Sequence, residues 1–184
     1  MTLLTPEIES LFQRYYRNDQ DLLATVLIHS ECVARKALDI IEKKKLDVDT
    51  DFVKEAAMLH DIGVVKCDAP AILCRGSLPY ICHGIEGRRM LEEAGMSRHA
   101  LVCERHTGSG LTAEDIIRQN LPLPRRDMCP VSMEEKLICY ADKFFSKSGN
   151  LTEEKALDKI ERQMRAFGDD SYSRFMKLQA IFGV

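Results

Sequence analysis

The chain has 184 residues, of which 45% are hydrophobic and 30% charged, and its formal net charge is −3. These values fit one globular domain and exclude a disordered or fibrous chain. The nearly balanced charge argues against a basic nucleic-acid-binding surface, and no apolar run reaches the roughly 18 residues that a membrane span needs.

The N-terminal segment, MTLLTPEIES, has no basic region ahead of an apolar one, so we expect no signal peptide and a cytoplasmic protein. In that setting the seven cysteines are expected to be reduced thiols. No CxxC pair occurs among them, which argues against a structural zinc knuckle. We therefore interpret the cysteines as small core or surface residues.

Helix signals dominate the first third of the chain. Thr5 followed by proline predicts a helix that begins before IESLFQRYYR. A long helix is expected over 21–44, because its apolar residues recur along one broad face. Asp49 or Thr50 can cap the next helix, FVKEAAMLHDIG, which Gly63 can end.

The rest of the chain continues in the same way, with helices expected over 81–93 and from Ser97. Capping boxes predict two further helix starts, at Thr112 and at Ser132, and Gly168 divides a final pair of helices that starts at Thr152. No segment shows the period-2 pattern of a strand.

Two stretches that contain proline or glycine, 64–80 and 121–130, are expected to be long loops. The sequence thus predicts one all-α domain with two long loops. Loops of this length in a compact domain are often functional.

Polar residues interrupt several of the apolar helices. Four of the five histidines and two aspartates occupy such positions: His29, His60, Asp61, His83, His106 and Asp142. Taken singly, a helical histidine is more often a hydrogen-bonded core or surface residue than a metal ligand, and an aspartate can cap a helix or form a salt bridge. Taken together, imidazoles and carboxylates on several helices favour a cage for a divalent metal, with iron, manganese or zinc suited to mixed N/O ligands.

The order His29, His60-Asp61, Asp142 resembles the H…HD…D signature of the HD-domain metal-dependent phosphohydrolases, and HDIG at 60–63 is a common spelling in that superfamily. The segments HTG at 106–108 and EEKLICYADK at 134–143 resemble the small HDIG hydrolases, including HD-type diadenosine tetraphosphate hydrolases. The resemblance covers about residues 22–148. It implies a single-domain HD-domain helical bundle over 1–184, with its metal site in the core and the helices of 152–183 packed on it.

The resemblance also implies a ligand set. His29, His60, Asp61 and Asp142 would hold one metal ion, and Asp61 would bridge to a second ion held by His83 and His106. Iron or manganese is expected most, with zinc, magnesium, cobalt or nickel as alternatives. Many two-metal relatives carry a lysine directly after HDIG, whereas here two valines precede Lys66.

The expected activity is hydrolysis of a phosphate ester or anhydride of a nucleotide or related small metabolite by metal-bound hydroxide, with Asp61 and His60 as catalytic residues. A thiol mechanism is disfavoured, because the histidines near Cys67, Cys82 and Cys103 are already committed as ligands. Two other classes stay open: a mixed-valent di-iron oxygenase and a non-catalytic nucleotide-binding sensor. Oxygen consumption by iron-loaded protein would separate the first of these from a hydrolase.

A small anionic phosphorylated substrate requires cations. The residues expected to bind it are loop cations: Lys66, Arg75, Arg125 and Arg126. Arg105 and Lys143 each follow or precede a ligand by one residue, so on a helix they should point about 100° away from it. Tyr80 is a candidate for stacking on a base or for packing. No nucleic-acid or membrane partner is expected, and the protein should be a monomer or a homodimer.

Overall fold

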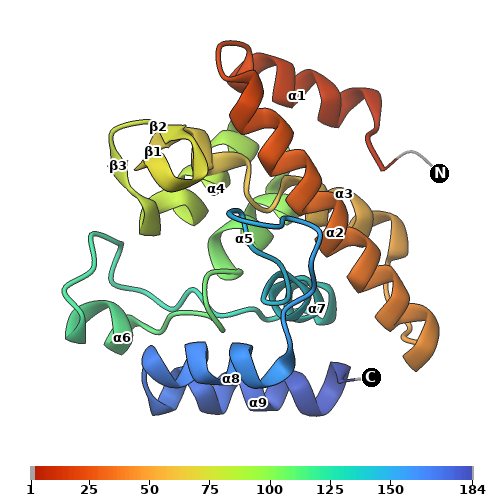
Figure 1. The fold of residues 1–184 in the computed structure, drawn as a ribbon, viewed down its shortest axis with the longest axis vertical. Coiled ribbons are helices and arrows are strands. Elements are labelled where there is room, and N and C mark those ends of the chain that lie inside the picture. The colour runs from red at the N-terminus through yellow and green to blue at the C-terminus, as the bar shows by residue number, and fades with distance from the viewer. Residues whose placement is uncertain (1–2, 184) are drawn as a thin grey trace.

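Nine α-helices account for most of the residues that the computed structural model describes, 3–183 (Figure 1). In chain order they are α1 (Pro6–Tyr16), α2 (Gln20–Lys44), α3 (Thr50–Leu59), α4 (His83–Glu93), α5 (Ser97–Arg105), α6 (Ala113–Arg118), α7 (Met133–Asp142), α8 (Leu157–Ala166) and α9 (Asp169–Phe182). The fold class is therefore all-α, as predicted. Within the described residues, no helix combines the length and apolar character that crossing a membrane requires.

Side-chain caps start several of these helices where the sequence predicts them. The side chains of Thr5, Asp49 and Ser132 each accept a backbone N–H three residues ahead. At Thr112 the capping box is complete, because Asp115 also accepts the N–H of Thr112. These starts could be predicted because each depends on residues adjacent in sequence.

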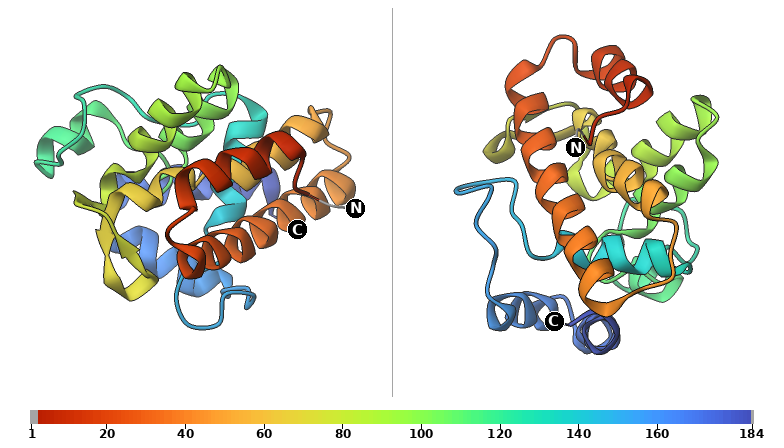
Figure 2. Two further views of the ribbon diagram at one scale, coloured as in Figure 1. Left: turned by 90° about the horizontal axis from the view of Figure 1, so that it is seen from above. Right: turned by 90° about the vertical axis from the view of Figure 1, so that its right-hand side faces the viewer.

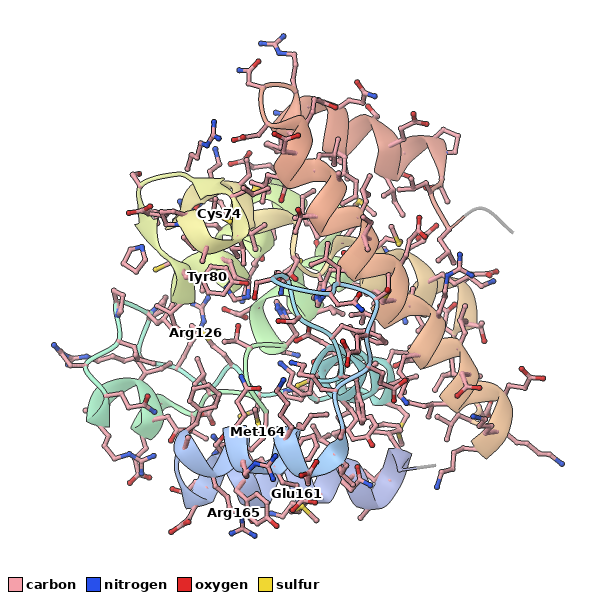
Figure 3. All side chains as sticks on the ribbon, viewed as in Figure 1. Cys74, Tyr80, Arg126, Glu161, Met164 and Arg165 are labelled. Atoms are coloured by element: carbon pink, nitrogen blue, oxygen red, sulfur yellow. The ribbon has the colours of Figure 1, made fainter. Side chains whose placement is uncertain are left out.

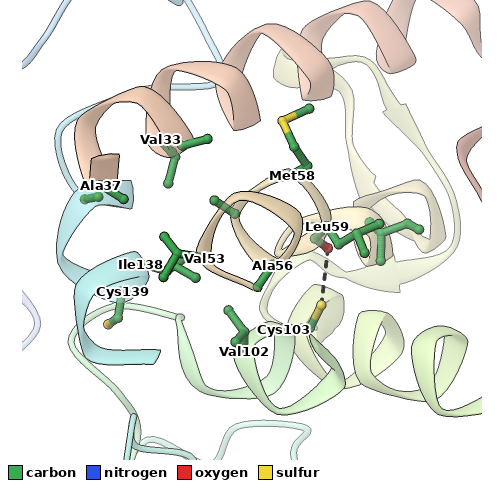
Figure 4. Close-up of a cluster of buried hydrophobic side chains, with 14 of the residues drawn as sticks. Val33, Ala37, Val53, Ala56, Met58, Leu59, Val102, Cys103, Ile138 and Cys139 are labelled. Carbon is green, nitrogen blue, oxygen red and sulfur yellow. Dashed lines mark hydrogen bonds between the residues drawn. The ribbon is translucent and has the colours of Figure 1, made fainter. Parts of the chain in front are cut away.

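The main core lies between α2, α3, α5 and α7 (Figure 4). The buried side chains drawn there include Val33 and Ala37 from α2, Val53 and Ala56 from α3, Val102 from α5 and Ile138 from α7. Burying a side chain of the size of valine or isoleucine contributes about 1.5–3 kcal/mol. Cys103 adds a polar link, since its thiol donates to the carbonyl of Leu59 at 3.2 Å. These four helices hold five of the six polar residues singled out in the sequence, within the helices or directly after them.

The segment 64–80 is not a featureless loop, contrary to expectation. It contains a small sheet of β1 (Cys67–Ala69), β2 (Cys74–Arg75) and β3 (Leu78–Pro79), in the order β2-β1-β3. β1 pairs antiparallel with β2 and parallel with β3. Strands of two or three residues are too short to show an alternating pattern, so the sequence could not predict them.

Three helix boundaries also differ from the prediction. α3 ends at Leu59, and Gly63 lies beyond it in a 3₁₀ turn, Ile62–Lys66. A Cβ on Gly63 would lie 2.1 Å from the carbonyl oxygen of His83, so this glycine permits close backbone contact rather than ending a helix. The helix expected from 81 begins at His83, after a 3₁₀ turn over Tyr80–Cys82. The first helix of the final pair starts at Leu157 rather than Thr152, because the chain at Ala156 is still extended.

The residues between α7 and α8 form a long connection, which Figure 2 shows as an extended loop. It is anchored where the N–H of Lys155 donates to the carbonyl of Phe144 at 2.7 Å. Beyond it, α8 and α9 pack against each other, and α9 packs on α7. This connection brings polar residues back toward the centre of the molecule.

Candidate metal centre

The six polar residues singled out in the sequence come together in the structure. Five of them lie at the ends of helices or directly after one. His60 and Asp61 follow α3, His83 begins α4, His106 follows α5 and Asp142 ends α7, while His29 lies within α2. The ends of these helices converge on one point, so all six side chains reach it, and all six residues are buried.

The first cluster consists of His29, His60, Asp61 and Asp142. Each offers one ligand atom within 4.8 Å of the others. His29 Nε2 lies 2.9 Å from Asp142 Oδ1 and 3.3 Å from Asp61 Oδ2, and His60 Nε2 lies 3.1 Å from the same Asp61 oxygen. These are two imidazole nitrogens and two carboxylate oxygens around a single point, which is a donor set for a divalent metal.

The second cluster shares Asp61 with the first and adds His83 and His106. Asp61 Oδ1 lies 3.5 Å from His83 Nε2 and 3.4 Å from His106 Nε2. The two oxygens of one carboxylate therefore face different histidine pairs. This geometry is the one expected of a carboxylate that can bridge two metal ions.

Backbone carbonyls fix the orientation of three of these imidazoles. His60, His83 and His106 each place Nδ1 within 2.7–2.8 Å of the carbonyl oxygen three residues earlier. Because a carbonyl only accepts, Nδ1 carries a proton, and in the neutral form of each ring the lone pair is on Nε2, which points into the cluster. Hydrogen bonds of this kind orient metal-ligating histidines and set their tautomer.

Two observations test whether the residues fit a metal. His60 Nε2 and Oδ1 of Asp61 are buried without a hydrogen-bond partner among the described residues. His83 Nε2 also lies 3.1 Å from His106 Nε2. Burial, followed by the proximity of His106, lowers the pKa of His83 to about 3, so its ring is neutral near pH 7 and the two lone pairs face each other. A cation between these nitrogens would remove that repulsion, and the donor set fits one.

Neighbouring charges keep the carboxylates of the centre ionised. Burial opposes ionisation of Asp61, but Lys147 and His60 outweigh it and hold its pKa well below the usual range. The pKa of Asp142 is lowered in the same way, with Lys143 and Lys147 outweighing burial. Burial also opposes the charged form of His60, yet Asp61 and Asp142 raise its pKa to about 9. Both carboxylates are therefore ionised in the protein interior, the form in which a carboxylate oxygen binds a divalent ion.

A cavity of about 640 Å³ opens beside the two clusters. His83, His106 and Asp142 form part of its wall, and three lysines line it: Lys143, Lys147 and Lys155. Its apolar wall includes Tyr80, which follows the small sheet, and Met164 of α8 (Figure 3). The Tyr80 ring stacks on the imidazole of His83 at 4.7 Å between centroids, so this tyrosine packs against a ligand candidate. The cavity could hold a small molecule with an anionic group toward the lysines.

One of the three cavity lysines, Lys143, was named from the sequence and assigned the wrong orientation. The expectation that Lys143 points away from the site is wrong. Its ammonium lies 2.6 Å from Asp142 Oδ2 and donates to the carbonyl of His106 at 3.1 Å, because a long side chain at the end of a helix can fold back. Lys147 and Lys155 were missed, since each lies in a polar segment, SKSGN or TEEKA, that has no pattern to distinguish it from an ordinary loop. Arg105 does point away, and binds Glu135 at 3.0 Å.

The four loop cations expected to bind substrate lie elsewhere. Lys66, Arg75, Arg125 and Arg126 are all exposed, and none of them is among the residues that line the cavity. Arg126 pairs with Glu104 at 2.5 Å (the arginine is labelled in Figure 3). The structure thus brings together the six ligand candidates but not these four residues, whose role stays a prediction.

The thiol of Cys67 is poorly suited to act as a nucleophile. Cys67 is buried, and burial raises the pKa of its thiol to about 12. A thiol of this kind is protonated near neutral pH and is a weak nucleophile. All seven cysteines are free.

Comparison with known proteins agrees with this geometry. The model of the HD domain matches residues 26–146. An uncharacterized protein of Methanocaldococcus jannaschii is 31% identical over 76% of this chain and 77% of its own length. Proteins named tRNA (cytidine(56)-2′-O)-methyltransferase match from Picrophilus torridus, at 30% identity over 75% of this chain, and from Thermoplasma volcanium, at 27% over 78%.

The match spans only 36% and 38% of the length of these two methyltransferases. No solved structure matches the chain significantly. The family model covers more than half of the chain and includes all six residues of the two clusters. The chain therefore belongs to the HD-domain superfamily.

Proposed function

We propose that this protein is a metal-dependent phosphohydrolase that cleaves a phosphate ester or anhydride of a nucleotide or related small metabolite. The observation that carries the proposal is the pair of clusters that share Asp61 and open into a cavity lined by lysines. The ligands indicate the type of chemistry, and the lysines indicate an anionic substrate.

In this proposal His29, His60 and Asp142 hold one divalent ion, His83 and His106 hold a second, and Asp61 contacts both. Iron or manganese is the expected metal. Bound there, two such ions would lower the pKa of water to about 7 and neutralise charge on a phosphoryl group.

The chain's own residues supply orientation and charge. The carbonyls that accept from Nδ1 keep the histidine Nε2 atoms directed at the centre. Lys143, fixed by Asp142 and by the carbonyl of His106, presents a positive charge at the cavity wall. Lys155 lines the same cavity and can pair with a phosphate oxygen of the substrate. Phe145 and Phe167 add apolar surface that limits water near the reacting group.

The test begins with elemental analysis of protein purified without a chelator, followed by a phosphate-release screen over nucleotides and sugar phosphates. We expect close to two divalent ions per chain and a substrate whose hydrolysis is lost in the Asp61→Ala variant. A single ion, with His83→Ala and His106→Ala both leaving the metal content unchanged, would contradict the dinuclear centre. Metal-loaded protein that hydrolyses nothing in the screen but consumes oxygen when loaded with iron would favour the oxygenase alternative.

The loop cations and the cavity lysines can be compared on the best substrate found. Arg75→Ala and the double variant Arg125→Ala/Arg126→Ala test the first group, and Lys155→Ala tests the second. Loss of a charge-assisted contact costs about 1.5–3 kcal/mol in kcat/KM. Lys155 lines the cavity and the arginines do not. A larger loss of kcat/KM for Lys155→Ala than for the arginine variants would therefore assign phosphate binding to the cavity.

The activity named for the two methyltransferase relatives is not part of this proposal. The segment that resembles this chain is little more than a third of each of those proteins. A direct assay for methylation of tRNA provides the check. Methyl transfer by this chain in the absence of phosphate release would overturn the proposed hydrolase.

A further inference from the structure

Lys147 makes a contact that the proposed function does not explain. It lies in the connection between α7 and α8, five residues after Asp142. Its Nζ is 2.5 Å from Oδ2 of Asp61, the carboxylate shared by the two clusters. The lysine side chain is 13% exposed and the aspartate is fully buried, so little water screens the pair.

The oxygen that Lys147 contacts is one that a metal ion would need. Oδ2 of Asp61 is the atom that faces His29 Nε2 at 3.3 Å and His60 Nε2 at 3.1 Å. An ammonium in direct contact with this oxygen and a divalent ion bound to it would repel each other strongly at such short range. The two cations therefore compete for Asp61.

The contact would also have a role when no metal is bound. Asp61 and Asp142 are buried carboxylates, and each is contacted by one lysine, Lys147 at 2.5 Å and Lys143 at 2.6 Å. A buried charge without a partner is strongly unfavourable. Without metal, the two ammonium groups would neutralise these two carboxylates.

The Lys147 ammonium has a second position available to it, inside the cavity. Its side chain lines the cavity, as do those of its neighbours Ser146 and Ser148. It belongs to a connection without helix or strand, and the four-carbon stem of a lysine is flexible. Because Lys147 already lines the cavity, the proposal requires only that its ammonium turn from Asp61 toward the space that a substrate would occupy.

We propose that Lys147 is an exchangeable counter-cation, bound to Asp61 in the metal-free protein and to the anionic group of the substrate in the metal-loaded protein. The proposal rests on the metal centre proposed above. It makes Lys147 a positioning residue for Asp61 in one state and a substrate-binding residue in the other.

The first experiment compares Lys147→Met with the wild-type protein after removal of metal. Mn²⁺ binding is measured by calorimetric titration, and stability by thermal unfolding. We expect Mn²⁺ to bind about tenfold more tightly to the variant. This is the change expected if Lys147 occupies Asp61 about nine-tenths of the time in the wild-type protein, because the substitution removes that competitor. The metal-free variant should unfold at a lower temperature, because Asp61 loses its counter-cation, and the difference should shrink once metal is bound.

Lys155→Met is the matched control. Lys155 lines the same cavity, but within the described residues it forms no ion pair with a carboxylate of the clusters. Its Mn²⁺ affinity should stay within about twofold of the wild-type value, because the substitution frees no ligand atom. Equal Mn²⁺ affinities for Lys147→Met and wild type would overturn the proposal. A wild-type protein that binds no metal would overturn the metal centre itself, and so the two failures are distinguishable.

A second measurement uses the wild-type protein and does not depend on the folding of a variant. Lys147 is labelled with an amine-reactive acylating reagent, and the extent of labelling is read by peptide mass spectrometry. Mn²⁺ should increase labelling of Lys147 by releasing it from Asp61, and inorganic phosphate added to the metal-loaded protein should lower it again. Labelling that Mn²⁺ leaves unchanged would contradict the exchange, and labelling that phosphate leaves unchanged would contradict the second position of the ammonium.

Discussion

Gly63, the glycine of the HDIG segment, allows a close approach between two backbone segments. A Cβ at this position would lie 2.1 Å from the carbonyl oxygen of His83 and 2.3 Å from the backbone nitrogen of Gly87. Both contacts are with the backbone of α4, so no side-chain rotation can relieve them. We therefore predict that Gly63→Ala forces α4 away from the 3₁₀ turn of Ile62–Lys66.

The size of the effect follows from these distances. Ordinary contact begins at 3.4 Å, which requires a displacement of about 1 Å in a core that is close-packed. Overpacking of this kind costs about 3 kcal/mol, at the upper end of the usual range. For a chain of this length, that lowers the midpoint of thermal unfolding by about 6–12 °C. Metal–ligand distances tolerate only about 0.2 Å, so His83 at the start of α4 would also be lost as a ligand.

Two measurements check this prediction: thermal unfolding of the metal-free protein and elemental analysis of the reconstituted protein. Gly95→Ala is the control, because its positive φ of 78° makes alanine unfavourable while no atom lies within 4 Å of the added Cβ. That variant should lose about 1–2 kcal/mol and keep its full metal content. If Gly63→Ala unfolded at the wild-type temperature and bound metal in the wild-type ratio, the argument from close backbone contact would be refuted.

Three further predictions concern the site and its surroundings. Asp61→Ala should abolish metal binding, measured by elemental analysis, because both clusters include this carboxylate. Cys67→Ala should keep the wild-type metal content and turnover. Loss of turnover by the cysteine variant at normal metal content would restore a thiol mechanism. Arg126→Ala should lower the free energy of unfolding by about 1 kcal/mol, as measured in urea, because the buried Glu104 loses one arginine and keeps Arg88, and an unchanged midpoint would contradict this. Removal of metal with a chelator should abolish phosphate release and lower the unfolding temperature, and added Mn²⁺ should restore both. Phosphate release that persists in metal-free protein would contradict the proposed chemistry.

Local sequence was sufficient to predict much of the helical framework. The caps at Thr5, Asp49, Thr112 and Ser132 form between residues three apart, so their hydrogen bonds need no information from the rest of the chain. The helix start at Leu157 was not predictable in this way. There the segment before α8 is fixed by the hydrogen bond from Lys155 to Phe144, which depends on how the connection folds back.

The ligand candidates could also be identified from the sequence, because a histidine or aspartate in an apolar helix is conspicuous. That His60 and Asp61 belong to one centre with Asp142 followed from the resemblance, and the structure brings them within 4.8 Å. No comparable pattern distinguishes Lys147, a lysine in a polar segment far from Asp61 along the chain.

The amino-acid sequence was sufficient to predict the set of helices and the polar residues that they could not bury without partners. Which charges those residues meet depends on the folded chain: Lys147 pairs with Asp61, Lys143 with Asp142 and Arg126 with Glu104. Helix formation and capping depend on neighbours within a few residues, whereas an ion pair can depend on where distant segments meet. Long, flexible cationic side chains leave no periodic pattern to show in advance which carboxylate each of them will contact.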